Sequence, residues 1–360
     1  MKKILILTAS FGEGHNAAAR GIRDGLARVA PDAEVEVHDL FAETYGALNQ
    51  LVRKAYLTLI NRWPRAWGSV YRWLDHKTTV NQDLGRLFSP VKNRFADLLA
   101  RFQPDAVVSV FPPYPYLLTQ ILGPGRSCQS VVVVTDSITV NAIWYRCSAN
   151  YFLVPNEPSA VVVREGGVAP ELIKTFGFPV SPKFADLAQD RPPPSESGRR
   201  VLYMINAGTK RAPELVSKLL DLDIELTVTV GRDEKLRRVI EASANKRKVE
   251  IVGWTDDLPR MLGASHLLIG KAGGATVQET IAARCPMIIN HVVSGQEEGN
   301  AQLIVETKSG AIAQSPDEVV AQVQRVFADN ARQWREWETN ISQLSRPRAS
   351  LDVAEFLLSL

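Results

Sequence analysis

The chain begins with a short apolar strand, a loop that contains glycines, and an amphipathic helix. Residues 4–7 are Ile-Leu-Ile-Leu, an apolar run typical of a strand buried on both faces of a parallel sheet. Residues 16–29 follow as a helix with one apolar stripe, formed by Ala17, Ala18, Ile22, Leu26 and Val29. A strand that leads into a helix is the repeating unit of doubly wound α/β folds. This order of elements therefore constrains the fold more than any other feature.

The same alternation recurs along the chain. We expect further strands at residues 34–40, 106–110, 131–135, 151–154, 201–205, 225–230, 249–252, 267–269 and 287–289. We expect helices at residues 212–220, 234–244, 275–283, 299–307, 333–344 and 351–360. Polar, proline-rich sequence near residue 195 interrupts the pattern, as an extended linker does.

The length of 360 residues suits two domains of ordinary size. We predict an α/β protein with two Rossmann-like doubly wound domains that face a cleft. The expected division is an N-terminal domain at residues 1–188, a linker at 189–200, a second domain at 201–332, and C-terminal helices at 333–360 that pack back on the first domain. Ligands of such sheets bind beyond the carboxyl ends of the strands, so functional residues should follow strands directly.

Composition excludes several classes of protein. With 22% charged and 45% hydrophobic residues, the chain is neither disordered nor collagen-like, and no run of eighteen apolar residues could span a bilayer. The three cysteines lie far apart and offer neither a disulfide framework nor a zinc site. The apolar run at residues 4–7 is too short for a signal peptide, which favours a cytoplasmic protein.

The first glycine loop, residues 10–17, allows three interpretations. Gly12 and Gly14 could simply form a tight turn in which His15 packs locally. The spacing from Gly12 to Ala17 also fits a dinucleotide-binding fingerprint, with Asp39 as the ribose-binding acid. Alternatively, His15 lies at the mouth of the cleft as a general base, because a neutral imidazole can take a proton from a hydroxyl.

A second glycine loop follows the strand at residues 267–269. Lys271, Gly273, Gly274 and Thr276 lie where a helix N-terminus can bind a diphosphate. Glu279 comes one turn later, within reach of a ribose diol. After the next strand, Gln296 and Glu297 can bond the hydroxyls of a hexose.

Two more strand ends carry distinctive residues. Gly231 and Arg232 end one strand, and Trp254 follows another. These features should converge with the second glycine loop on one surface. Asp221 and Asp223 match a DxD metal motif, but they precede a strand, so we interpret them as a solvated turn.

These motifs together resemble one family of enzymes. TASFGEGHNAAA, VGRDEKL, VGWTDDLPRML, KAGGATVQE and SGQEEGNA occur in this order along nearly the whole chain. The combination resembles the monogalactosyldiacylglycerol synthase and processive diacylglycerol glucosyltransferase family. The resemblance implies a GT-B fold and inverting transfer of a sugar from a UDP-sugar to a membrane lipid, with no metal site and no cofactor besides the UDP-sugar.

The resemblance also implies roles for individual residues. His15 corresponds to the catalytic base, and Glu279 to the ribose ligand. Gln296 and Glu297 correspond to the sugar ligands, with Asn300 supporting their loop. Gly231, Arg232 and Trp254 fall where the family holds uracil and ribose. The sequence departs from the family at residues 206–211, which hold a single glycine, and at Asn141 and Asn150, where the family often has a histidine and an acid.

Residues 46–101 combine basic and aromatic side chains. They hold ten Lys and Arg against three Asp, a net charge of +7 in a chain whose total is +3. Such a segment suits an anionic membrane surface and a lipid acceptor. It could also be an ordinary helical insertion, and a nucleic-acid partner is not expected. The residues expected at the acceptor or membrane are Arg62, Trp63, Arg65, Trp67, Tyr71, Arg72, Trp73, Asp136 and Trp144.

We therefore expect an inverting glycosyltransferase that moves a hexose from UDP-glucose or UDP-galactose to a lipid such as diacylglycerol. We expect it at the inner face of the cell membrane as a peripheral protein. The alternatives are a UDP-sugar epimerase of the same architecture, a nicotinamide-dependent enzyme, and a nucleotide-sugar-binding protein without catalysis.

Overall fold

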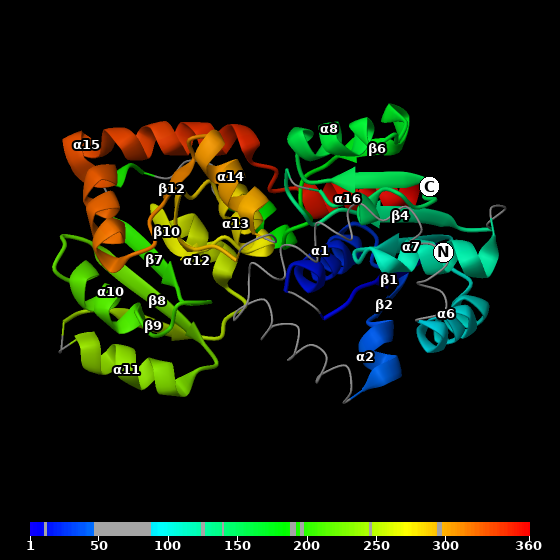
Figure 1. Ribbon diagram of the computed structural model, residues 1–360, viewed down its shortest axis with the longest axis horizontal. Helices are drawn as coiled ribbons and strands as arrows, with labels where there is room; N and C mark the ends of the chain where they lie inside the picture. The colour runs from blue at the N-terminus through cyan, green and yellow to red at the C-terminus, as the bar shows by residue number, and fades with distance from the viewer. Residues whose placement is uncertain are drawn as a thin grey trace. The chain divides into compact units, whose positions relative to one another are not determined.

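The computed structural model describes two compact units, each built around its own parallel sheet (Figure 1). The first unit comprises Met1–Pro182, Val293–Gly299 and Arg348–Leu360, and the second comprises Lys183–Val292 and Asn300–Pro347. The described residues are 1–10, 13–46, 88–123, 127–138, 140–187, 192–194, 198–244, 247–293 and 297–360.

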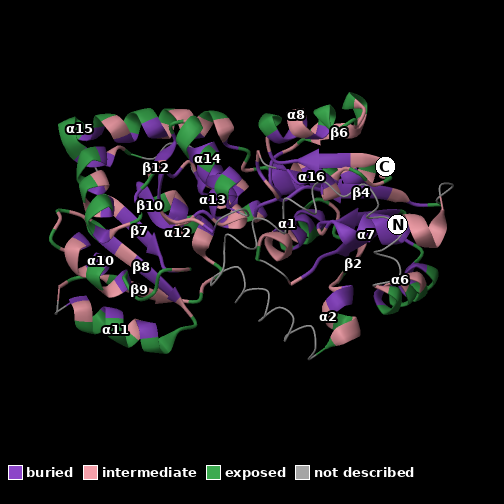
Figure 2. Cartoon of the chain, viewed as in Figure 1, coloured by how far each residue is buried: buried purple, intermediate pink, exposed green. Residues whose placement is uncertain are grey.

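The sheet of the first unit has the strand order β2-β1-β3-β4-β5-β6, and all its pairings are parallel. Its strands are β1 (Lys3–Leu7), β2 (Glu34–His38), β3 (Ala106–Ser109), β4 (Gln129–Val133), β5 (Tyr151–Val154) and β6 (Ile173–Thr175). Its helices are α1 (Glu13–Val29), α2 (Leu40–Tyr45), α6 (Ser89–Phe102), α7 (Pro113–Leu122), α8 (Glu157–Glu165) and α16 (Ala349–Ser359). The centre of the sheet is buried on both faces, as its apolar strands predict (Figure 2).

The last helix of the chain packs in the first unit against α1. Gly25 of α1 lies so close to α16 that a Cβ there would be 2.4 Å from the Ser350 carbonyl oxygen. The Phe356 ring, farther along α16, contacts the Tyr151 ring of β5 at a centroid distance of 5.0 Å. The chain therefore returns to the first sheet after completing the second.

The sheet of the second unit has the order β12-β11-β10-β7-β8-β9 and is also entirely parallel. Its strands are β7 (Arg200–Met204), β8 (Glu225–Gly231), β9 (Glu250–Gly253), β10 (Leu267–Lys271), β11 (Met287–His291) and β12 (Gly310–Ile312). Its helices include α10 (Ala212–Leu219), α11 (Glu234–Ala244), α12 (Leu258–Ala264), α13 (Gly274–Ala282) and α15 (Pro316–Leu344), while α14 (Glu298–Glu306) spans the boundary between the units. Strand order reverses between β7 and β10, which makes this the point where α/β sheets bind ligands.

The observed elements correct several sequence-based bounds. The first helix begins at Glu13 rather than 16, so His15 lies inside its first turn. The second strand ends at His38, because Asp39 caps α2 instead of extending the strand. The short strands β6 and β12 and the helix α12 were not expected. The helix expected at 333–344 is found as the part of α15 that follows a break at residues 328–331, where the backbone leaves the helical region. The part of α15 before this break, which starts at Pro316, was not expected.

No helix within the described ranges has the length and apolar character needed to cross a bilayer. Cys128, Cys147 and Cys285 are all free thiols. The basic aromatic residues 47–87 lie outside the described residues, so the membrane segment stays a prediction.

Candidate active site

His15 lies in the first turn of α1, surrounded by residues that follow β3 and β4. Its Nδ1 is 3.1 Å from the Thr135 hydroxyl oxygen. The Phe111 ring meets the imidazole edge-on at a centroid distance of 5.3 Å, and the Trp144 ring lies at 5.9 Å. A ring N–H of His15 also donates to the Val110 carbonyl. The segments that follow β3 and β4 thus converge on one imidazole.

The pKa of His15 is lowered from 6.5 to about 4, because burial disfavours the charged ring more strongly than the Val110 bond favours it. The imidazole is therefore neutral at physiological pH. A neutral imidazole has one N–H and one unprotonated nitrogen. With the N–H bonded to a carbonyl, the other nitrogen can accept a proton, as a general base requires.

Asp136 and Trp144 form one side of this cluster. The Trp144 indole N–H donates to an Asp136 carboxylate oxygen at 2.8 Å, and the indole is buried. Ile138 lies between Asp136 and Trp144 in the sequence. Its φ of 59° is an energetically costly conformation for a β-branched residue. Its backbone N–H donates to the Ser159 hydroxyl at 3.1 Å. Strained backbone of this kind is concentrated at functional sites.

Asp39 stabilises the first glycine loop instead of facing a ligand. One carboxylate oxygen accepts the Ser10 N–H at 2.8 Å, and the other accepts the Ala42 N–H at 2.9 Å. The neighbouring Tyr114 hydroxyl, fully buried, donates to the Thr8 carbonyl at 2.7 Å. Because both oxygens of Asp39 are used locally, the geometry disfavours the dinucleotide interpretation, in which this acid binds a ribose.

The second glycine loop leads into α13 without a side-chain cap. Gly273 is the N-cap residue, and within the described part of the chain it provides no side-chain cap for the first turn. The Asn300 amide donates to the Ala272 carbonyl at 3.1 Å and holds the loop, while its buried Oδ1 has no partner among the described residues. Free backbone donors at a helix N-terminus suit a phosphate. Thr276 is buried, and Glu279 is half-buried one turn along.

The structure describes only part of the predicted hexose-binding turn. Glu297 is buried and accepts the Val293 N–H at 3.0 Å. Gln296 lies outside the described residues. Glu297 belongs to the first unit, whereas Lys271, Gly274 and Glu279 belong to the second.

Two strand ends of the second sheet carry an exposed aromatic residue and a cation. Gly231 has a φ of 59°, a left-handed conformation that favours glycine. This turn lets the Arg232 guanidinium stack over the Trp254 ring, 4.9 Å from its centroid. Trp254 is 64% exposed, which is unusual for so large an apolar side chain and leaves its ring open to a ligand.

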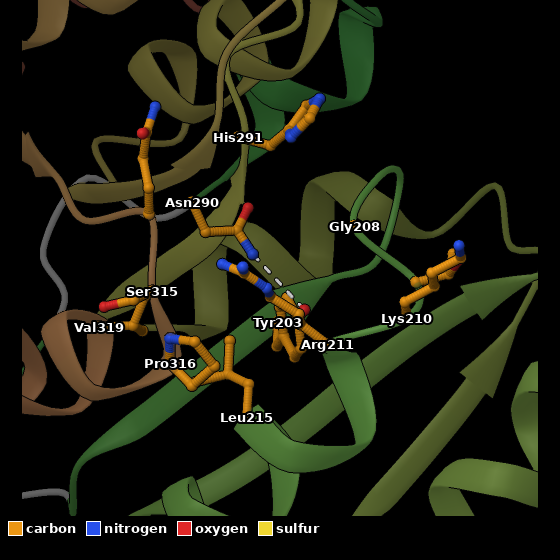
Figure 3. A pocket seen from close by; sticks show the side chains of 12 residues that line it. Tyr203, Gly208, Lys210, Arg211, Leu215, Asn290, His291, Ser315, Pro316 and Val319 are labelled. Carbon is orange, nitrogen blue, oxygen red and sulfur yellow. Dashed lines mark hydrogen bonds between the residues drawn. The ribbon is translucent and has the colours of Figure 1, made fainter. Parts of the chain in front are cut away.

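A pocket of about 410 Å³ opens in the second unit at the ends of β7 and β11 (Figure 3). The loop after β7 and the start of α15 complete its walls. The residues that line it are Tyr203, Gly208, Thr209, Lys210, Arg211, Leu215, Asn290, His291, Gln314, Ser315, Pro316 and Val319. Three of them, Thr209, Lys210 and Arg211, lie in the glycine-poor loop at residues 206–211, where the sequence allows phosphate contact to pass to these side chains. The other lining residues were not in the predicted site, although Asn290 and His291 follow a buried strand, the position where functional residues are expected.

The structure therefore brings together three sets of predicted residues. His15 joins Asp136 and Trp144 in the first unit. Arg232 joins Trp254, and Asn300 contacts the loop before α13. Gly14 lies beside His15 in α1. Gly12 and the predicted membrane residues between 62 and 73 lie outside the described residues.

Other predicted features have structural roles in this fold. Asp221 and Asp223 are exposed and pair with Arg247 and Arg199. At the two family departures, the Asn141 side chain caps a short helical turn and the Asn150 side chain accepts the Ser130 N–H. No cluster of three or more potential metal ligands occurs among the described residues.

Comparison with known protein families indicates which of the possible enzyme classes this chain resembles. Residues 15–180 match the family described as monogalactosyldiacylglycerol (MGDG) synthase, and residues 203–347 match the glycosyltransferase family 28 C-terminal domain. Residues 15–180 thus belong to the MGDG synthase family, and residues 203–347 to glycosyltransferase family 28. The two matches include His15, Asp136 and Trp144 in the first case and Trp254, Glu279 and Asn300 in the second.

Curated members of the MGDG synthase family align with almost the whole chain. A probable MGDG synthase 2, chloroplastic, from Oryza sativa subsp. japonica is 27% identical over 98% of this chain and 80% of its own length. The chloroplastic MGDG synthase of Spinacia oleracea is 27% identical over 99% of this chain and 72% of its own length.

Solved structures with a similar fold include several enzymes. MurG of Acinetobacter baumannii has a TM-score of 0.64 at 14% identity, covering 100% of both chains. Os79 of O. sativa has a TM-score of 0.65 at 12% sequence identity, covering 99% of both chains. A UDP-GlcNAc 2-epimerase of Neisseria meningitidis has a TM-score of 0.62 at 12% sequence identity, covering 99% of this chain and 100% of the epimerase chain. The similarity to these structures establishes the GT-B fold of this MGDG synthase relative. The matches to the two protein families establish that it is a glycosyltransferase.

Proposed function

We propose that the protein transfers a hexose from UDP-glucose or UDP-galactose to the hydroxyl of a membrane lipid such as diacylglycerol, with inversion. Membership of the MGDG synthase family gives the reaction class, a glycosyltransferase of glycolipid synthesis. The observation that carries the proposal is His15, a neutral imidazole held by Thr135 and the Val110 carbonyl.

In the proposed reaction, His15 accepts the proton of the lipid hydroxyl as its oxygen attacks the anomeric carbon. The bond from that carbon to the diphosphate breaks, and UDP leaves from the opposite face of the sugar. The sugar therefore changes its anomeric configuration. Negative charge grows on the leaving diphosphate, and the uncapped N-terminus of α13 at Gly273 can stabilise it.

The same proposal assigns the remaining predicted residues. Trp254 and Arg232 would hold the uracil, and Glu279 the ribose. Gln296 and Glu297 would bond the hexose, in a loop that Asn300 supports. The first unit would then receive the acceptor, and the second would hold the nucleotide part of the donor. The proposed reaction uses no metal ion and no cofactor, and the UDP-sugar is its co-substrate.

We further propose that the protein works as a peripheral protein on the cytoplasmic face of the cell membrane. The support is the charge of +7 and the tryptophans within residues 46–101. Tryptophan settles at headgroup depth, and basic residues are attracted to anionic lipids.

The direct test incubates the protein with labelled UDP-glucose or UDP-galactose and mixed membrane lipids. Mass spectrometry of the extracted lipids identifies the hexose and the acceptor, and NMR of the product gives its anomeric configuration. We expect a hexosylated lipid with the configuration opposite to that of the donor. Release of free sugar or an epimerised nucleotide sugar, with no labelled lipid, would contradict the proposal.

A further inference from the structure

Ile138 lies near the middle of a loop that contacts His15 at both ends. The loop, residues 135–144, begins just after β4. At its start, the Thr135 hydroxyl oxygen is 3.1 Å from Nδ1 of His15, and at its end the Trp144 ring lies at a centroid distance of 5.9 Å from the imidazole. The conformation of this loop therefore determines the surroundings of the imidazole.

Two hydrogen bonds hold the ends of the loop. The Trp144 indole N–H donates to an Asp136 carboxylate oxygen at 2.8 Å and joins the two ends to each other. The Ile143 carbonyl accepts the Tyr116 hydroxyl of α7 at 2.9 Å. Neither bond involves the backbone at Ile138, so the middle of the loop depends on a different contact.

Ile138 has a backbone conformation that its own side chain disfavours. Its φ of 59° lies in the left-handed region, where a β-branched side chain is crowded against the backbone. Glycine adopts this conformation readily, and asparagine and aspartate do so with the help of a local side-chain hydrogen bond. The apolar isoleucine side chain can form no such bond. A conformation of this kind persists only where the surrounding structure holds it.

Ser159 of α8 holds Ile138 through its hydroxyl. The oxygen accepts the Ile138 N–H at 3.1 Å, and the Ser159 side chain is fully buried. The same hydroxyl donates to Oδ1 of Asn156 at 2.8 Å, so its proton is directed at Asn156 and its lone pairs are left to accept. Asn156, the N-cap residue of α8, also accepts the Ser159 backbone N–H at 3.0 Å. The hydroxyl is thus an oriented acceptor for one conformation of Ile138.

We propose that Ser159 is a positioning residue for hexosyl transfer, which holds the loop at residues 135–144 so that Thr135 and Trp144 stay against His15. The inference rests on the proposed function, because it takes His15 as the base. Ser159 has no chemical step of its own, and its effect reaches the imidazole through the loop. A base that loses its orientation lowers the rate of the chemical step, whereas the affinity for the donor is kept.

Kinetics of hexosyl transfer by the full-length protein test this role. Ser159→Ala, which removes the acceptor, should lower kcat by about 3- to 10-fold, as loss of a hydrogen bond does, and should leave the KM for the UDP-sugar within about 2-fold of the wild-type value. Ser130→Ala is the matched control, because the Ser130 hydroxyl is also buried in the first unit and has no partner among the described residues. Its kcat should stay within about 2-fold of the wild-type value. A kcat of Ser159→Ala equal to that of the wild-type protein would overturn the proposal.

Ile138→Gly separates positioning of the loop from a general loss of stability. Glycine adopts a φ near 59° without steric cost, so the loop keeps its turn when the acceptor on α8 is removed. In the Ile138→Gly background, Ser159→Ala should therefore lower kcat by less than about 2-fold. An equal loss of kcat in both backgrounds would overturn the proposal, because Ser159 would then act independently of the conformation of Ile138.

A measurement without substrate follows the loop directly. The indole N–H signal of Trp144 in proton–nitrogen NMR spectra reports its bond to Asp136, and Trp144→Phe assigns it among the seven tryptophans. Ser159→Ala should shift this signal, whereas Ser130→Ala should leave it in place. In the Ile138→Gly background, Ser159→Ala should no longer shift it. A Trp144 signal that does not move in folded Ser159→Ala would overturn the proposal.

The two measurements distinguish failure of this inference from failure of the proposed function. A wild-type protein that transfers no hexose to lipid, while its Trp144 signal responds to Ser159→Ala as expected, would contradict the proposed function and support the hold of Ser159 on the loop. A wild-type protein that transfers hexose, with neither kcat nor the signal changed in Ser159→Ala, would overturn this inference alone. Thermal unfolding checks the fold of each variant. If Ser159→Ala does not fold, Ser159→Cys, whose thiol is a weak acceptor, takes its place in every comparison.

Discussion

The Nδ1 atom of His15 and the hydroxyl oxygen of Thr135 lie 3.1 Å apart, although 120 residues separate them in the chain. This contact joins the first turn of α1 to the end of β4. It fixes the imidazole between Phe111 and Trp144, at the carboxyl edge of the first sheet. A base held in this way keeps one orientation toward its substrate, which lowers the cost of reaching the reactive geometry.

The pH dependence of hexosyl transfer should report the His15 environment. The neutral imidazole is the active form, and its pKa is lowered to about 4. Activity should therefore stay constant as pH falls through 6.5, the usual histidine value, and decline only as pH approaches about 4. The measurement is kcat/KM against pH, with circular dichroism to verify the fold at the acid end. An acid limb centred near pH 6.5 would contradict the assigned environment.

Thr135→Val should lower kcat for hexosyl transfer without changing the affinity for UDP. The substitution keeps the shape of the side chain and removes the hydroxyl that contacts His15. A hydrogen bond is worth about 0.5–1.5 kcal/mol, so we expect a fall of about 2- to 10-fold. Thr135→Ser, which retains the hydroxyl, is the matched control. Equal rates in the wild-type, Val and Ser proteins would show that the contact does not position the base.

Trp254→Ala should weaken uridine and UDP binding to the same extent, because its ring is proposed to contact the base and not the phosphates. Trp254 is 64% exposed and stacked by Arg232, so its removal should not disturb the core. Loss of one stacking contact is worth about 1–3 kcal/mol, which corresponds to about 5- to 150-fold in Kd. Trp254→Phe should restore most of the affinity. A selective loss of UDP binding with uridine unaffected would place the residue at the phosphates instead.

Tyr114→Phe should destabilise the first unit. The Tyr114 hydroxyl donates to the Thr8 carbonyl and accepts the Leu40 N–H inside the core. The substitution leaves two buried backbone groups unpaired, which costs about 1–3 kcal/mol. Urea denaturation measures the free energy of unfolding of each variant. Tyr45→Phe is the control, because no described residue forms a hydrogen bond with the Tyr45 hydroxyl. A difference below about 0.5 kcal/mol between the two variants would contradict this role for Tyr114.

The sequence predicted the fold well and the site in part, for identifiable reasons. Buried apolar runs such as residues 4–7 and 267–269 determine strands of a parallel sheet, and these strands were found. Strand β12 (Gly310–Ile312) was missed because three residues are too few to give a pattern. The low pKa of His15 results from burial of the imidazole, which lies beside Phe111 and Trp144 only in the folded chain. The pocket around Tyr203 likewise needs β7, β11 and α15 together.

Binding to anionic vesicles should depend on salt and on residues 46–90. The segment from 46 to 101 carries a net charge of +7, and exposed charges are screened within about 10 Å at 0.1 M salt. Sedimentation with phosphatidylglycerol vesicles should show binding that weakens as salt is added and is lost on deletion of residues 46–90. Binding that salt does not affect, or no binding to these vesicles, would contradict the membrane role of the segment.

The central claim is that His15 is the base of a lipid glycosyltransferase, and His15→Ala tests it most directly. One assay measures the transfer of labelled hexose to lipid by the variant. Calorimetry measures the affinity of the variant for the same UDP-sugar. The account predicts that transfer is abolished while donor affinity stays within about 2-fold of the wild-type protein, since only the proton acceptor is removed. A variant that binds the donor and still transfers hexose at the wild-type rate would contradict it.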